Sequence, residues 1–351
     1  MVVDFRYHLV SLISVFFALA IGIILGAGPL QNSIGNVLQG QVADLRVTNE
    51  NLKQENADLA QAIDSQDQAF NEIAPSLVEG TLTGRTVAIV VLPGVVEADV
   101  SAARAKLELA GAKVTGQASV TEAWTAASTT SFRSTFSDQI RSYVPGVADD
   151  ADTNLVLAQA LNALVREGAA KHDTLAGLMT GTDTPMLAID GLGEAADAVL
   201  VFAPDVDMPA DADADAVAQQ QYTTQTLSAL VTELGTRGPA AVAGAANSDT
   251  DVVKVLREAG APVSTIDSPD TVVGQINAAI AVANELRDQL VHLGLDAGAQ
   301  AIMGARTEAP AQAAPAEPAE PAEEPAAEPS EDSQPAEEPA DAGESDEADN
   351  A

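Results

Sequence analysis

The chain begins with two hydrophobic patterns placed end to end. Residues 9–30 are uncharged and mostly apolar, and from residue 38 to residue 73 apolar side chains recur at alternating spacings of four and three. About 20 helical residues cross a hydrocarbon core of roughly 30 Å, so the first pattern predicts a transmembrane helix. The second is the heptad pattern of a coiled coil, which we assign to residues 31–75.

The apolar segment has two interpretations, an uncleaved anchor and a cleaved secretory signal. Small residues at Ala18 and Ala20 would suit cleavage. However, the segment is longer than the roughly 7 to 15 apolar residues usual for a signal, and Asp4 offsets the charge of Arg6. We therefore expect a single-pass anchor in the cytoplasmic membrane, with residues 1–8 as a cytosolic head and the rest of the chain outside.

Small side chains recur every four residues within the predicted span, at Ala18, Gly22 and Gly26. This spacing places them on one stripe of the helix, where a second backbone can approach closely. The stripe is either a dimer face or lipid-facing surface.

The heptads predict a parallel homodimer. With residue 38 at a d position, the a and d residues of the expected seam are Leu38, Val42, Leu45, Asn49, Leu52, Asn56, Leu59, Ile63, Gln66, Phe70 and Ile73. Two asparagines at successive a positions favour a two-stranded seam, in which they hydrogen-bond across the interface and fix the register. The alternative is an amphipathic helix that lies on its own domain. We expect Pro75 to end the helix, and Gly28, Pro29 and Gly35 to interrupt it before the coil.

Strand and helix patterns alternate over residues 81–300. Strands are predicted at residues 86–92, 112–120, 198–203, 240–245 and 262–267, and helices at 97–110, 217–235, 249–259 and 271–293. This alternation predicts an α/β domain with a mostly parallel sheet covered on both faces, Rossmann-like or flavodoxin-like. Residues 121–184 are expected to form a helical insertion, most clearly at 153–168. Asp249 is expected to cap the helix that Gly260 ends.

Charge and composition exclude several classes of protein. The net charge is −36 with only 16 basic residues, which argues against nucleic acid as a partner. Fifteen acidic and no basic residues lie between Glu308 and Asp349, among alanines and prolines. We therefore expect residues 305–351 to be a disordered tail, either an extended arm or a solvated spacer. The chain has no cysteine, and hence no disulfide or thiolate site.

Candidate chemistry is sparse. Gly191-Leu-Gly193 resembles part of a dinucleotide fingerprint, but the next predicted strand follows too soon for the required helix, so we interpret it as a turn. The aspartates between Asp205 and Asp215 lack the glycine and glutamate of an EF-hand, so we interpret them as a solvated loop. The three histidines and the methionines are scattered and form no copper-type ligand cluster. We expect no enzyme activity, no catalytic residue, no cofactor and no metal site.

The segment DFRYHLVSLISVFFALAIGIILGAGPL, at residues 4–30, and the asparagine-containing heptads after it carry a family resemblance. The chain resembles the MctB-type copper transporter family of actinobacterial single-span cell-envelope proteins. The resemblance implies a role in copper homeostasis or efflux, with copper as a possible ligand. It also implies a second role, as the membrane partner of a cytosolic thiamine-pyrophosphokinase-like protein in envelope integrity and cell separation. The cytosolic contact would then lie at Asp4, Phe5, Arg6, Tyr7 and His8.

Two functions follow from these observations. The first is a component of copper homeostasis or export. The second is a non-enzymatic scaffold that recruits or regulates cell-separation or peptidoglycan-processing partners in the envelope, together with the cytosolic protein. Because direct copper transport needs ligands that this sequence does not cluster, the resemblance alone does not decide between them.

Overall fold

Two helices make up the N-terminal quarter of the chain. The computed structural model describes residues 5–27, 29–181, 183–209 and 211–311. Helix α1 is Phe5–Ala27 and helix α2 is Pro29–Val78. Within the described residues, one segment is long and apolar enough to cross a membrane, Phe5–Gly26, and none of it is buried against the rest of the protein. The helix thus begins four residues before the predicted span.

Helix α2 differs from the predicted coil at two points. Gly35 lies within the helix and does not interrupt it, and the helix continues past Pro75 for one more turn. Proline lacks an N–H donor but keeps its carbonyl, and the Pro75 oxygen accepts the N–H of Glu79 at 2.9 Å. The last turn is held because Ala74 and Val78 are buried in the core of the domain.

The α/β domain is built on a seven-stranded sheet. The strands are β1 (Thr86–Val91), β2 (Lys113–Val120), β3 (Leu187–Gly191), β4 (Ala198–Phe202), β5 (Ala240–Ala243), β6 (Ser264–Ile266) and β7 (His292–Leu293). Their order is β3-β2-β1-β4-β5-β6-β7, and all neighbours are parallel except β3, which runs antiparallel to β2. The predicted α/β class and mostly parallel sheet are confirmed. Leaving out the edge strands β3 and β7, the order is flavodoxin-like, and it reverses direction between β1 and β4.

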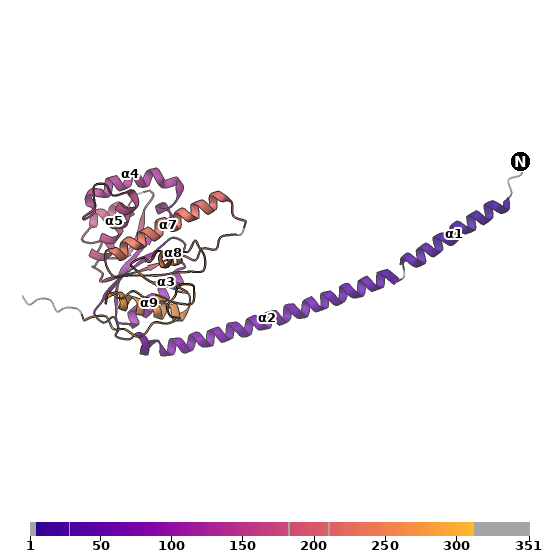
Figure 1. Cartoon of the computed structure of the whole chain (residues 1–351), viewed down its shortest axis with the longest axis horizontal. Coiled ribbons are helices and arrows are strands. Elements are labelled where there is room, and N and C mark those ends of the chain that lie inside the picture. Colours follow the sequence, from indigo (N-terminus) through magenta and orange to yellow (C-terminus); the bar gives the residue numbers. More distant parts are fainter. Residues whose placement is uncertain (1–4, 28, 182, 210, 312–351) are drawn as a thin grey trace, which may run out of the picture. The chain divides into compact units, whose positions relative to one another are not determined.

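Helices cover both faces of this sheet (Figure 1). The helices of the domain are α3 (Glu97–Leu109), α4 (Thr130–Ile140), α5 (Thr153–Glu167), α6 (Asp173–Thr180), α7 (Ala214–Thr236), α8 (Val252–Ala259) and α9 (Val272–Glu285). On one face, α3, α9 and the end of α2 enclose side chains such as Ile89 and Leu200. On the other, the helices α4 to α8 enclose side chains such as Val90 and Val201. Alternate residues of each buried strand therefore serve opposite cores.

Two boundaries near the C-terminus correct the sequence prediction. The helix predicted over 271–293 ends at Glu285, because Asp288 adopts a left-handed conformation (φ 57°) and the chain returns as strand β7. The predicted cap Asp249 is instead exposed and paired with Lys254, and Asp251 precedes α8. Asp251 accepts the N–H groups of Asn247 and Ser248 at 3.0 and 2.7 Å, so it organises the loop before the helix. Gly260 ends α8 in the left-handed conformation, as predicted.

The C-terminal end of the described chain joins α2 to the domain. Arg306 donates to the carbonyl oxygens of Ser76 (3.2 Å) and Glu79 (2.8 Å), at the end of α2. Ala309 donates its N–H to the Thr81 carbonyl at 2.8 Å and packs against the core. Seven residues of the predicted tail, 305–311, are thus ordered against the domain, whereas 312–351 lie outside the described residues.

Candidate functional site

The predicted dimer face of the span lies on one stripe of α1. Ala18, Gly22 and Gly26 are exposed, and a Cβ added at either glycine would meet no other atom within 4 Å. Phe5, Arg6, Tyr7 and His8 form the first turn of the same helix and are exposed, while Asp4 lies outside the described residues. This face is open to a second helix, to lipid or to a protein partner.

The predicted seam of the coil is also open along most of its length. The a and d side chains from Leu38 to Ile63 are exposed, including both asparagines. Phe70 is the exception, because it is partly buried against the α/β domain. Helix α2 thus makes no contact with the domain through residue 66 and lies on its own domain after that, so the dimer seam stays a prediction for the part before residue 66.

A cavity that the sequence did not reveal lies at the carboxyl end of the parallel strands. It has a volume of about 390 Å³ and lies between the loops that follow β1, β4, β5 and β6. In open α/β sheets, ligands bind where the strand order reverses, here between β1 and β4. The sequence signals for it are Pro93-Gly94 and Pro204-Asp205, each of which begins two residues after a buried strand ends.

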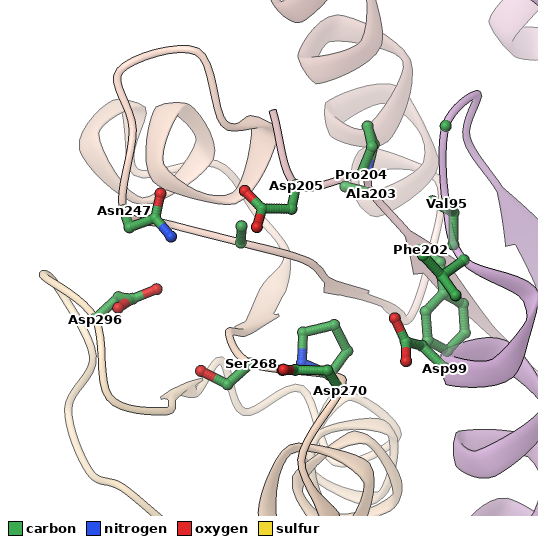
Figure 2. Close-up of a pocket in the computed structure, with 14 residues that line it drawn as sticks. Val95, Asp99, Phe202, Ala203, Pro204, Asp205, Asn247, Ser268, Asp270 and Asp296 are labelled. Atoms are coloured by element: carbon green, nitrogen blue, oxygen red, sulfur yellow. The ribbon is translucent and has the colours of Figure 1, made fainter. Parts of the chain in front are cut away.

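The cavity is strongly acidic. Figure 2 shows the carboxyl groups of Asp99, Asp205, Asp270 and Asp296 around one hollow, with Asn247 and Ser268 between them. Among the residues that the structure describes, none that lines the cavity is a lysine, arginine or histidine. Burial, and then the nearby charge of Asp270, raise the pKa of Asp99 above its ordinary value. Such a lining disfavours phosphate and pyrophosphate groups, so the residues do not fit the dinucleotides that Rossmann-like folds often bind.

A buried ion pair holds one wall of the cavity. The Asp267 carboxylate is fully buried at the end of β6 and accepts Arg257 Nη1 at 2.9 Å. It also accepts the N–H groups of Leu295 (2.6 Å) and Asp296 (3.2 Å). Gly294 is required next to it, because a Cβ there would lie 2.0 Å from the Asp267 carboxylate. Asp267 therefore fixes the loop that places Asp296 in the cavity.

The other candidate ligands lie in separate elements. His8 is in α1, His172 lies beside Glu167 at the end of α5, and His292 in β7 bonds to Thr265 Oγ1 at 2.9 Å. Across the described ranges, no three His, Cys, Asp or Glu side chains form a group that could hold a metal ion. Carboxylate oxygens suit hard cations, whereas copper(I) prefers thiolate, thioether or imidazole ligands.

The remaining sequence motifs have structural explanations. Gly191 ends β3 and Leu192 begins the connection to β4, both at positive φ, and this connection contains no helix that could bind a pyrophosphate. In the acidic run, Asp213 caps α7 by accepting the N–H of Ala216 at 2.7 Å, and Asp205 reaches the cavity. Sequence reasoning missed both roles.

Comparison with known proteins places these features in a family. The family described as "Copper transport outer membrane protein, MctB" matches residues 2–303. The chain is similar to the copper transporters MctB of Mycobacterium tuberculosis and Mycobacterium bovis, with 28% identity over 120 residues in each case. The alignment covers 34% of this chain and spans 38% of the length of these relatives. Two such matches, one over nearly the whole chain and one over a third of it, point to the same family.

Proposed function

Because the chain belongs to the MctB family, whose members are copper-transport-related envelope proteins, we propose that it supports copper homeostasis as a membrane-anchored parallel dimer. The observation that carries this proposal is the direct succession of an exposed apolar helix and an exposed heptad seam. The first needs a membrane and the second needs another helix. The α/β domain is then the part that the dimer presents to other molecules.

The proposed topology has the N-terminus in the cytosol and the α/β domain outside the cytoplasmic membrane. We propose that the Ala/Pro/Glu-rich segment stays hydrated outside the membrane, because dense like charges repel one another.

The exposed apolar face of α2 supports the proposed dimer. An isolated helix is marginal in water and gains most of its stability from packing of an apolar face. Here the apolar a and d residues are roughly half exposed or more from Leu38 to Ile63. A second copy of α2 in parallel would cover them and would pair Asn49 and Asn56 with their own counterparts.

Copper enters this proposal indirectly. A single helix without intramembrane charge cannot line a hydrophilic path by itself, and the cavity of the domain offers hard oxygen ligands. We therefore propose a non-enzymatic accessory component of copper export or tolerance, in which the domain acts on partner proteins and does not hold copper(I) itself.

Copper tolerance and copper binding test this proposal together. The full chain in lipid nanodiscs is titrated with copper(I) against a chelator of known affinity, and a strain lacking the gene is grown in copper. We expect no binding that competes with the chelator. We expect the strain without the gene to be sensitive to copper, and the wild-type chain to restore its tolerance. Tight stoichiometric copper binding would show a direct carrier, and unchanged copper tolerance would remove the copper role.

A second candidate function is a scaffold for cell-separation or peptidoglycan-processing proteins, acting with a cytosolic thiamine-pyrophosphokinase-like partner. Its support is the first turn of α1, where the aromatic side chains of Phe5 and Tyr7 are more than three-quarters exposed beside Arg6. A photo-crosslinking residue at Tyr7 should capture a cytosolic protein, whereas the same residue at Leu19 in the span should not. Equal capture at both positions would contradict a specific cytosolic contact.

A further inference from the structure

The apolar stripe of α2 changes its partner near residue 66. Ile63, at an a position, is 59% exposed. The next a residue, Phe70, packs against the α/β domain, and Ala74 and Val78 are 1% and 0% exposed. In the heptad register, Phe70, Ala74 and Val78 occupy an a, an e and a b position. Because successive residues are turned by about 100° around a helix, these three positions form a stripe whose centre lies about 75° from the centre of the a/d seam. The domain therefore covers one edge of the seam without covering all of it.

Specific contacts hold the domain on that side of the helix. Lys106 of α3 donates to the Asn71 side chain at 2.5 Å, and Asp67 is partly buried one turn earlier. Helix α9 packs against the same stretch of α2. On the opposite flank, Ala69 and Ser76 at the g positions remain exposed, as does Ile73 at d (47%).

We propose that the dimer seam of α2 ends between Ile63 and Phe70, where each protomer's own α/β domain replaces the partner helix. A parallel partner helix that continued past residue 66 would have to contact Phe70 from the a side. That side chain and the neighbouring e flank are already occupied by the domain. The two α2 helices thus pair over residues 38–66 and separate at the domains. This inference rests on the proposed dimer and specifies where it stops.

Cysteine crosslinking of the full chain tests this endpoint, because the natural sequence contains no cysteine. The two most informative positions are Leu59 and Ile73. Both are d residues two heptads apart, and they are 56% and 47% exposed in the protomer, so neither is protected by its own domain. Gln61→Cys, at an f position on the opposite face, is the control for random collisions.

We expect Leu59→Cys to form an intermolecular disulfide in membranes under mild oxidation, at least tenfold faster than Ile73→Cys or Gln61→Cys. Ile73→Cys should stay reactive to maleimide, which shows that the thiol is accessible and unpaired. Equal rapid crosslinking at Leu59→Cys and Ile73→Cys would overturn the endpoint while leaving the dimer intact. Rates at Leu59→Cys no higher than at Gln61→Cys would overturn the dimer itself.

Discussion

Helix α2 and the α/β domain bury their apolar side chains in opposite ways. In the domain, strand residues such as Ile89 and Val90 face two cores that the same chain closes with its own helices. In α2, residues such as Leu45 and Leu59 repeat regularly but remain exposed until the helix reaches the domain. The domain can therefore be stable alone, whereas the proposed dimer would make the free part of α2 depend on a second copy of the chain. Substitutions in the two regions should act on different equilibria, namely folding and association.

The largest expected effect tests the independence of the domain. Asp267→Ala removes the partner of Arg257 and leaves a buried guanidinium beside unpaired N–H groups. Breaking a buried pair in this way costs about 3–5 kcal/mol, so we expect that loss in the free energy of unfolding. Chemical denaturation measures it, and dimer mass below the transition should be unchanged.

The matched control is Asp249→Ala, which breaks an exposed ion pair with Lys254. Its effect on the free energy of unfolding should be far smaller, because exposed ion pairs contribute little to stability. If the two variants lose equal stability, the Asp267 network does not hold the domain together.

The second prediction addresses the free part of α2. Lysines in place of both Asn49 and Asn56 would bring like charges together at two successive a positions. We expect dimerisation to weaken by about a hundredfold, roughly 3 kcal/mol, without loss of domain stability. Sedimentation equilibrium of the full chain in detergent measures the mass.

Gln54→Lys with Gln61→Lys adds the same charge on the f face of the same helix. The Gln54/Gln61 double variant should remain dimeric. It should restore copper tolerance to the strain lacking the gene, whereas the Asn49/Asn56 double variant should not. An unchanged dimer in the Asn49/Asn56 variant would refute the seam.

These two regions also differ in how far the sequence predicts them. The buried strands and their helices follow from local apolar runs and turn residues, so the α/β class and most boundaries could be predicted. The end of the seam could not, because Phe70 fits the heptad as well as Ile63 does. Its partner is decided by contacts with α3 and α9, far away in sequence.

The cavity is hidden from sequence for a similar reason. Asp99 lies in the first turn of α3, and Asp205, Asp270 and Asp296 lie in three separate loops, so only the strand order brings them together. Strand β7 is two residues long and forms because Thr265 and Asp267 of the β6 segment donate to the carbonyls of Val291 and Leu293. No local pattern indicates such a short edge strand.

A smaller effect is expected where the two regions meet. Arg306→Ala removes two hydrogen bonds to carbonyl oxygens at the end of α2. We expect a loss of about 1 kcal/mol in unfolding free energy, since charged hydrogen bonds at a half-exposed site are partly replaced by water. Arg306→Lys is the control: it keeps the charge but not the fork that reaches both oxygens, and should recover less than half of the loss. Full recovery by lysine would mean that charge alone acts here.

The smallest expected effect is on the pH dependence of the unfolding free energy of the domain. Glu285 at the end of α9 is buried and accepts the N–H of Ser264 at 2.5 Å, and burial raises the pKa of its carboxyl group above the ordinary value. Because the folded pKa exceeds the unfolded one, the folded state binds more protons between them. The contribution of Glu285 to stability is therefore full below the unfolded pKa of about 4.5 and is lost as pH rises through the folded pKa.

The variant Glu285→Gln keeps an oxygen for Ser264 but cannot ionise. The unfolding free energy should therefore fall less steeply in this variant than in the wild type as pH rises above about 4.5. A rise in the unfolding free energy of the wild type over this pH range would mean that the nearby Arg166 holds Glu285 ionised in the folded state. The sedimentation of the wild type and of the Glu285→Gln variant should be the same over this range, because the effect lies within the domain.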